Sequence, residues 1–145
     1  PAYAGIPLTH REYSSSVAFV TGSQGEGKGE GVRWDQLAKA VDTLVIYMGV
    51  GQLEAICQQL IRHGRPQDTP AALISWGTWD CQETLTGTLA DLAAKVRAKG
   101  LKSPAIIVVG DVVRLREQLA WFEQQLADRE GEALLEQDWL LAQGG

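Results

Sequence analysis

Short apolar runs that alternate with segments of helical period constrain the fold of this 145-residue chain more than any other feature. The runs cover residues 43–48, 70–75 and 104–110, and a continuous apolar run of this length is typical of a strand covered on both faces. Between the first two runs the apolar spacing becomes i, i+3, i+4 and i+7, which places on one helical face Leu53, Ile56, Cys57 and Leu60. His63 and Gly64 then supply a helix stop.

Further elements follow the same alternation. The β-branched and aromatic run 16–21 predicts a first strand, 34–40 a short helix, and 82–87 a shorter strand. A helical stripe contains Leu89, Leu92, Ala93 and Val96, and another, expected to form one long helix, contains Val112, Leu115, Leu119, Phe122 and Leu126. Strand–helix–strand alternation favours crossover connections, so we expect an α/β fold with a mostly parallel (mixed) sheet covered by helices.

Composition excludes several classes of function. The formal net charge is −5, so a general electrostatic attraction to nucleic acid or to an anionic membrane surface is not expected. The longest apolar run is strand-sized and far shorter than the roughly 20 residues of a membrane span. Cys57 and Cys81 have neither disulfide-framework nor zinc-site spacing. We therefore expect reduced thiols, no metal, no nucleic-acid or membrane partner, and a cytoplasmic protein.

The glycine-rich tract 22–29 follows a strand and matches a phosphate-binding loop up to its last position. That position needs a hydroxyl to hold magnesium, and Gly29 has none. Glu26 would repel a phosphate, and no helix follows directly. The tract is therefore interpreted as a surface loop.

Two glycine-containing segments follow strands that we expect to end at the same edge of the sheet. Gly49-Val50-Gly51 comes after the strand 43–48, and Trp76-Gly77-Thr78 comes after the strand 70–75. Either segment is compatible with a simple tight turn, but ligands of open α/β sheets bind at such an edge, and two such ends together favour a cleft. His10-Arg11 is either a solvated pair or a clamp for a carboxylate.

An ordered series of segments resembles the second half of uroporphyrinogen-III C-methyltransferases, members of the tetrapyrrole methylase family. The matching segments are 3–11, 16–22, 43–49, 104–110 and 112–122, with Gly77-Thr78, Gln82 and Gly87-Thr88-Leu89 in the right order between them. The resemblance covers about residues 1–123. It implies a three-layer tetrapyrrole-methylase C-terminal domain that belongs to a two-domain enzyme.

The resemblance also implies a function and a set of site residues. Members of the family bind S-adenosylmethionine between their two domains and release S-adenosylhomocysteine. They methylate uroporphyrinogen III at two ring carbons, which gives precorrin-2 for sirohaem and cobalamin synthesis. Carried over by position, Met48, Gly77 and Ala105 are expected to contact the cofactor, and Arg11 to contact the carboxylates of the tetrapyrrole. The resemblance assigns no catalytic residue and no metal, and it implies a homodimer.

The domain organisation follows from the same comparison. We expect residues 1–127 to be the C-terminal domain and 128–145 to be a tail that is either helical or frayed. The resemblance does not include the family's N-terminal domain with its glycine-proline loop, and the first residues are typical of the middle of a protein. We therefore expect a fragment of a longer chain that is inactive alone, because half of the cleft is missing.

Three positions depart from the family pattern: Ser23 stands where the family often has His, Glu83 where it often has Arg, and Asp111 where it has Glu. Two alternatives stay open. The chain could belong to a methylase of a later precorrin, or to a regulatory or assembly domain that kept the fold without the chemistry.

Overall fold

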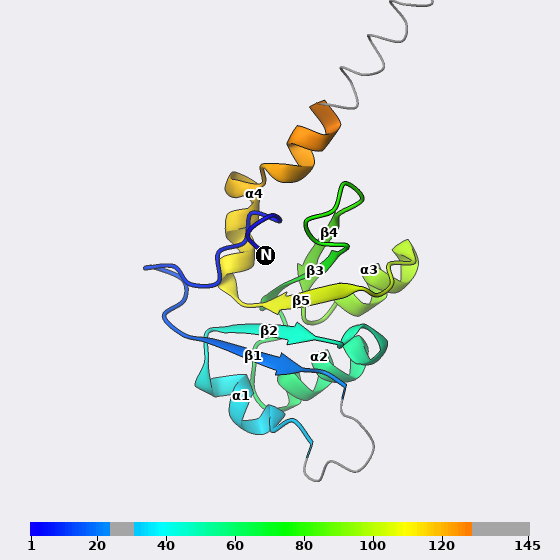
Figure 1. Cartoon of the computed structure of the whole chain (residues 1–145). Coiled ribbons are helices and arrows are strands. Elements are labelled where there is room, and N and C mark those ends of the chain that lie inside the picture. The colour runs from blue at the N-terminus through cyan, green and yellow to red at the C-terminus, as the bar shows by residue number, and fades with distance from the viewer. Residues whose placement is uncertain (24–30, 129–145) are drawn as a thin grey trace, which may run out of the picture.

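A five-stranded sheet organises residues 1–23 and 31–128, the part of the chain that this computed structural model describes (Figure 1). The strands are β1 Val17–Thr21, β2 Thr43–Tyr47, β3 Pro70–Ser75, β4 Glu83–Thr88 and β5 Ala105–Val109. The helices are α1 Trp34–Ala40, α2 Leu53–Arg62, α3 Leu92–Lys99 and α4 Arg116–Leu119, with short 3-10 turns η1 Val50–Gln52 and η2 Asp111–Leu115. The predicted glycine-rich loop and the tail lie largely outside the described residues.

The strand order is β1-β2-β5-β3-β4. The α/β class and the mixed sheet are confirmed, but the expected predominance of parallel pairing is wrong, because among the described strands only β1 and β2 pair in parallel. β2 and β3 do run in the same direction, as their helical crossover requires. However, β5 inserts between them and is antiparallel to both. A covered apolar run predicts burial on two faces and contains no information on the direction of its neighbours.

The helices α1, α2 and α3 cover one face of the sheet. The four predicted α2 residues are all buried there, together with Ala38, Leu92 and Val96 from the other two helices and Leu44, Leu73 and Ile107 from the strands. Gly64 and Gly100 end α2 and α3 in left-handed conformations, as glycine allows. The sequence prediction of these three helices is confirmed.

The opposite face of the sheet is covered by the N-terminal segment and η2. Ala4 and Ile6 pack with Val112 and Val113 against the alternate residues of the central strands, Ala72, Ile74 and Val108. In Figure 1 the N-terminal segment and α4 lie above the sheet as drawn, while α1 and α2 lie below it. The chain therefore has three layers, although only one outer layer consists mainly of helices.

The single long helix expected over 112–126 is wrong. The chain forms η2 and α4, becomes extended at Ala120, and resumes as a helix over 122–128. The N-terminal turn occupies the space beside this break: a Cβ on Gly5 would lie 2.5 Å from the carbonyl of Leu119, and the indole N–H of Trp121 donates to Ala2 O at 3.2 Å. The spacing of apolar residues gives no information about this contact between the N-terminal turn and the break in the helix.

The turn that precedes β2 is held by side chains from two sides. Asp42 Oδ2 accepts hydrogen bonds from the backbone and hydroxyl groups of Ser15 and Ser16, at 2.8 to 3.1 Å. From the other side, the buried guanidinium of Arg65 donates to the carbonyls of Val41 and Asp42. These contacts fix the start of β2 and therefore the register of the strand that ends at Tyr47.

Candidate functional site

An apolar pocket of about 520 Å³ lies where β2 and β3 end and β5 begins. Its floor contains Tyr47, Ile106 and Ile74, which are consecutive neighbours across β2, β5 and β3 in the register of the sheet. Tyr3 and the indoles of Trp76 and Trp79 also line it. We call this site the aromatic pocket. It contains Trp76-Gly77-Thr78, one of the two segments at which the sequence predicts a cleft, whereas the other segment, Gly49-Val50-Gly51, does not line it.

Backbone conformation is unusual around the aromatic pocket. Within the described residues, the non-glycine residues with positive φ are Met48, Trp76 and Thr78, at +51°, +49° and +74°. All three follow the carboxyl ends of β2 and β3. Left-handed backbone at a non-glycine residue costs on the order of 1 kcal/mol or more and is concentrated at ligand sites and tight turns. The strain therefore coincides with the edge that carries the pocket.

Gly77 leaves space in the wall of the aromatic pocket. A Cβ at this position would meet Ile74 Cγ2 at 3.6 Å and Gln82 Oε1 at 3.9 Å, which are ordinary contacts, and its φ is not in the left-handed region. A larger side chain at position 77 is therefore compatible with the backbone. It would extend from a residue that lines the pocket.

Ala105 is the second predicted residue that lines the aromatic pocket. It pairs with Ser75 in the sheet, and the backbone N–H of Trp76 donates to Pro104 O at 3.0 Å. The start of β5 thus holds the start of the loop that contains Gly77. The structure brings these two predicted residues together in one pocket.

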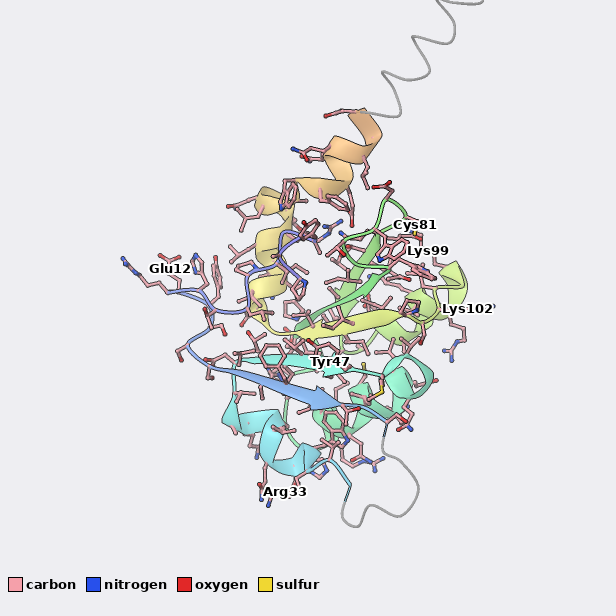
Figure 2. The ribbon with its side chains drawn as sticks, viewed as in Figure 1. Glu12, Arg33, Tyr47, Cys81, Lys99 and Lys102 are labelled. Carbon is pink, nitrogen blue, oxygen red and sulfur yellow. The ribbon has the colours of Figure 1, made fainter. Side chains whose placement is uncertain are left out.

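Met48 and Arg11 lie elsewhere. Met48 follows Tyr47 at the same edge and is 64% exposed, but it is not among the residues that line the pocket. Arg11 is in an exposed hairpin closed by the bridge between His10 and Ser14, and Ser14 Oγ contacts Thr43 Oγ1 at the start of β2. The hairpin is therefore at the opposite edge of the sheet, as the positions of Glu12 and Lys102 show in Figure 2.

A polar network lies behind the loop 76–79. Gln82 Oε1 accepts from the backbone N–H of Thr78 at 2.8 Å, and Gln82 Nε2 donates to Glu123 at 3.1 Å. The same carboxylate accepts from Thr84 Oγ1 at 2.5 Å and pairs with Arg116. Burial alone would raise the pKa of Glu123, but the hydrogen bonds from Thr84, Arg116 and Gln82 and the charge of Arg116 together lower it. Glu123 is therefore a carboxylate at neutral pH.

Sequence reasoning did not single out Tyr3, Trp79 or the role of Gln82 in this site. Tyr3 and Trp79 are far from each other in sequence and have no spacing that would connect them. Gln82 did carry a signal, because it is one of the positions that match the family; in the structure it is buried directly before β4. Glu83, which departs from the family pattern, forms an ion pair with Lys99.

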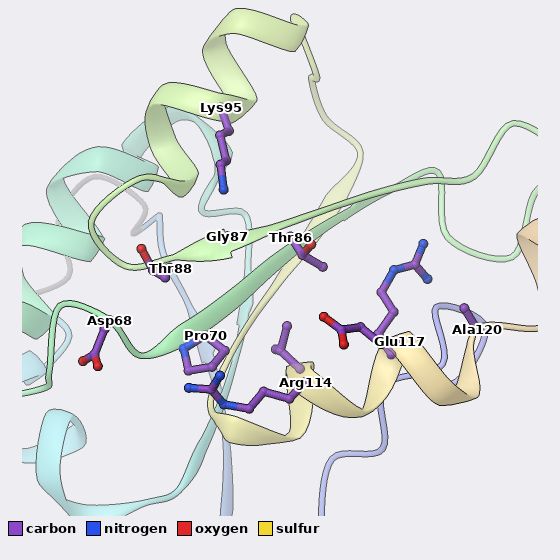
Figure 3. A pocket seen from close by; sticks show the side chains of 11 residues that line it. Asp68, Pro70, Thr86, Gly87, Thr88, Lys95, Arg114, Glu117 and Ala120 are labelled. Carbon is purple, nitrogen blue, oxygen red and sulfur yellow. The ribbon is translucent and has the colours of Figure 1, made fainter.

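A second pocket, of about 410 Å³, lies at the other end of β3 and β4 beside α4 (Figure 3). Its lining includes Lys95 and Arg114, which would suit an anion. Each of these cations already has an acidic partner: Lys95 pairs with Asp91 at 2.8 Å and Arg114 with Asp111 at 3.2 Å. The sequence predicts no site here, and the paired cations give no reason to place one.

Several general features can be read from the described residues. No cluster of three or more potential metal ligands occurs in them, and no helix among them combines the length and apolarity that crossing a membrane requires. Both cysteines are free, and burial together with the charge of Glu54 raises the pKa of Cys57 to about 11.

The mixed sheet and the open apolar pocket where β2 and β3 end define an α/β domain with a candidate ligand site. The sequence model of the tetrapyrrole (corrin/porphyrin) methylases matches residues 1–93. The chain therefore belongs to this family, as its resemblance predicts.

Curated relatives agree with this assignment. The uroporphyrinogen-III C-methyltransferase of Priestia megaterium is 54% identical over 112 residues, which are 77% of this chain and 47% of that protein. The siroheme synthase of Pseudomonas fluorescens is 53% identical over 122 residues, which are 84% of this chain and 26% of that protein. The chain thus spans about half of the first relative and about a quarter of the second.

Solved structures also match the fold. The native uroporphyrin-III C-methyltransferase of Thermus thermophilus superposes with a TM-score of 0.65 at 31% identity, covering 78% of this chain and 49% of that chain. The same enzyme complexed with S-adenyl homocysteine matches equally well.

Proposed function

We propose that this chain is the C-terminal domain of an enzyme that transfers methyl groups from S-adenosylmethionine to two ring carbons of uroporphyrinogen III and so makes precorrin-2. The observation that carries the proposal is the aromatic pocket, in which Gly77 and Ala105, both expected from the family pattern, line one cavity. The identity to a relative named uroporphyrinogen-III C-methyltransferase supports the choice of substrate.

The pocket has properties that suit this cofactor. Its surface is mainly aromatic and aliphatic, with backbone groups of a strained loop at one side, and adenosine is a flat group with polar edges. S-adenosylmethionine supplies a methyl group that is already activated on a sulfonium. The protein must therefore chiefly hold that methyl group in line with the ring carbon at short distance. Methyl transfer by this route uses no metal, and we assign no catalytic side chain.

The proposed roles of the site residues follow the geometry. Gly77 and Ala105 contact the cofactor within the pocket. Met48, which is exposed at the same end of the sheet but does not line the pocket, contacts the part of the cofactor that extends out of it. Arg11, at the opposite edge, binds a tetrapyrrole carboxylate.

The proposal includes the setting of the domain. Residues 1–127 form the C-terminal domain and 128–145 a tail, the cofactor-loop domain stands before them, and the enzyme is a cytoplasmic homodimer. Exposed aromatic residues such as Phe19 and Trp79, at 57% and 64%, are suited to being covered by a partner surface. Light scattering of the 145-residue chain should show self-association at high micromolar concentration, and a clean monomer would contradict this part.

Titration of the full-length enzyme with S-adenosylhomocysteine tests the cofactor assignment. Gly77→Leu should weaken binding at least roughly tenfold, because the new side chain competes for the space of the ligand. Ala98→Leu is the matched control, since Ala98 is exposed on α3 and lies outside the pocket. Equal affinity of Gly77→Leu and the unmodified enzyme would refute the assignment.

A second measurement separates this enzyme from the alternatives. Incubation of the full-length protein with uroporphyrinogen III, a later precorrin or no tetrapyrrole identifies the methylated product by mass. A chelator should leave the rate unchanged, and a rate that zinc restores would contradict the proposed mechanism. The isolated chain should bind S-adenosylmethionine very weakly, because it supplies only one wall of the cleft.

A further inference from the structure

The loop 76–79 needs an external support for its conformation. Two of its residues, Trp76 and Thr78, have left-handed backbone, and neither is a glycine. Such conformations persist only where surrounding contacts impose them. The loop forms a wall of the aromatic pocket, so whatever holds it also sets the shape of the pocket.

Gln82 supplies two of these contacts. Its side-chain Oε1 accepts from the N–H of Thr78 at 2.8 Å, and its backbone N–H donates to Trp79 O at 2.8 Å. The residue is 7% exposed, so water competes little for these bonds. Gln82, which itself lines the aromatic pocket, therefore holds the loop that contains Gly77.

Glu123 determines which way the amide of Gln82 points. An amide can rotate by 180°, which exchanges its acceptor oxygen with its donor nitrogen. An ionised carboxylate only accepts, so the Gln82 Nε2 that lies 3.1 Å from Glu123 must face it, and Oε1 is left to face Thr78. The two hydrogen bonds thus require the same orientation.

Glu123 is itself fixed from two further elements. Thr84 Oγ1 on β4 donates to it at 2.5 Å, and Arg116 on α4 forms an ion pair with it. A second nitrogen of Arg116 donates to Ala4 O at 2.6 Å. These bonds connect the loop 76–79 of the pocket to the helix 122–128, to α4 and to the N-terminal segment.

We propose that Gln82 is a positioning residue for the cofactor, held in its working orientation by Glu123, and that this pair sets the affinity of the 76–79 loop for S-adenosylmethionine. The inference rests on the proposed function, and it adds two residues that do not themselves carry out methyl transfer. It also assigns a role to the segment after α4, because Glu123 in that segment binds Gln82.

Exchange of the two side chains tests the pair in the full-length enzyme. Gln82→Glu places two carboxylates against each other and should raise the Kd of S-adenosylhomocysteine at least roughly tenfold. Glu123→Gln removes the fixed acceptor and should raise it by roughly threefold. The double exchange Gln82→Glu with Glu123→Gln restores an acceptor toward Thr78 and a donor between the two side chains, and should recover the Kd to within roughly threefold of the unmodified enzyme.

Two controls make the result specific to positioning. Thr86→Val lies on the same strand as Thr84 and has no described bond to Glu123, so it should leave the Kd unchanged. The KM for S-adenosylmethionine should follow the Kd across the series, while the KM for the tetrapyrrole stays constant. If Gln82→Glu lowers the folded fraction, Glu123→Gln, which introduces no new charge, makes the same comparison.

The outcomes separate the inference from the proposed function. An unmodified enzyme that binds no S-adenosylhomocysteine would overturn the proposed function. An unmodified enzyme that binds it, with single variants of equal Kd or a double exchange without recovery, would overturn the role of the pair and leave the proposed function in place.

Discussion

Replacement of Arg65 by Met should destabilise the domain measurably, because the guanidinium closes the turn before β2. Arg65 is 7% exposed, and it donates to Val41 O at 3.0 Å and to Asp42 O. Met keeps most of the apolar stem and removes both donors. The change therefore tests the hydrogen bonds more than the packing.

The expected loss follows from these contacts. Two hydrogen bonds from a charged group contribute about 3 kcal/mol together at the lower end of their range. Burial lowers the pKa of Arg65, so the cost of burying the cation offsets part of this contribution. The net effect is a decrease of about 2 kcal/mol in the free energy of unfolding, or about 6 °C in Tm for a chain of this size.

Urea unfolding followed by circular dichroism measures this loss. Arg62→Met is the control, because Arg62 is exposed in the last turn of α2 and carries the same chemical change. It should cost about 0.5 kcal/mol or less. If Arg65→Met and Arg62→Met unfold at the same urea concentration, the turn is not held by Arg65 as described.

Three further predictions concern other parts of the fold. The backbone N–H of Ser15, and then the hydroxyls of Ser15 and Ser16, lower the pKa of Asp42 from 3.8, so the stabilisation from these hydrogen bonds is complete above that pH and is lost as the pH falls through the lowered pKa. Asp42→Asn should flatten the fall of the urea midpoint below pH 4, and an unchanged slope would contradict this. Cys81 should react rapidly with a thiol reagent at pH 8 while buried Cys57, with its pKa of about 11, should not, and two rapid thiols would be inconsistent with the structure. Gly110→Ala should destabilise the fold by about 2 kcal/mol, since φ is +147° and a Cβ would lie 2.7 Å from Asp42 O; urea unfolding with the same stability as the unmodified chain would argue against that contact.

The sequence predicted those features that depend on local pattern. Helix α2 was predicted from its apolar period because Leu53 and Leu60 fall on the face that the sheet buries, and tertiary contacts agree with the local preference. Gly77 and Ala105, in contrast, were assigned by resemblance. They meet in one pocket because β5 is antiparallel to β3, which places the start of β5 beside the end of β3. The prediction of α2 therefore needed no knowledge of the sheet, whereas the meeting of these two residues depends on strand direction.

Features that depend on long-range contacts were not predicted. The direction of β5 is set by its two neighbours, and the break at Ala120 by the approach of Gly5. Arg11 was assigned by resemblance, and no local pattern could state at which edge of the sheet its hairpin would lie. Glu123 acts through Gln82, which is 41 residues earlier in the chain, so no spacing indicated the pair.

The position of β5 in the sheet has a consequence for how the domain folds during synthesis. β5 is the last of the described strands to be synthesised, yet it lies between β2 and β3. Without β5, the sheet would be divided into the pair β1–β2 and the pair β3–β4, and each pair would have an apolar strand with unpaired backbone groups at its edge. A chain that stops before residue 104 should aggregate through these edges. The floor of the aromatic pocket, which needs Ile106, is consequently among the last parts of the domain to form during translation.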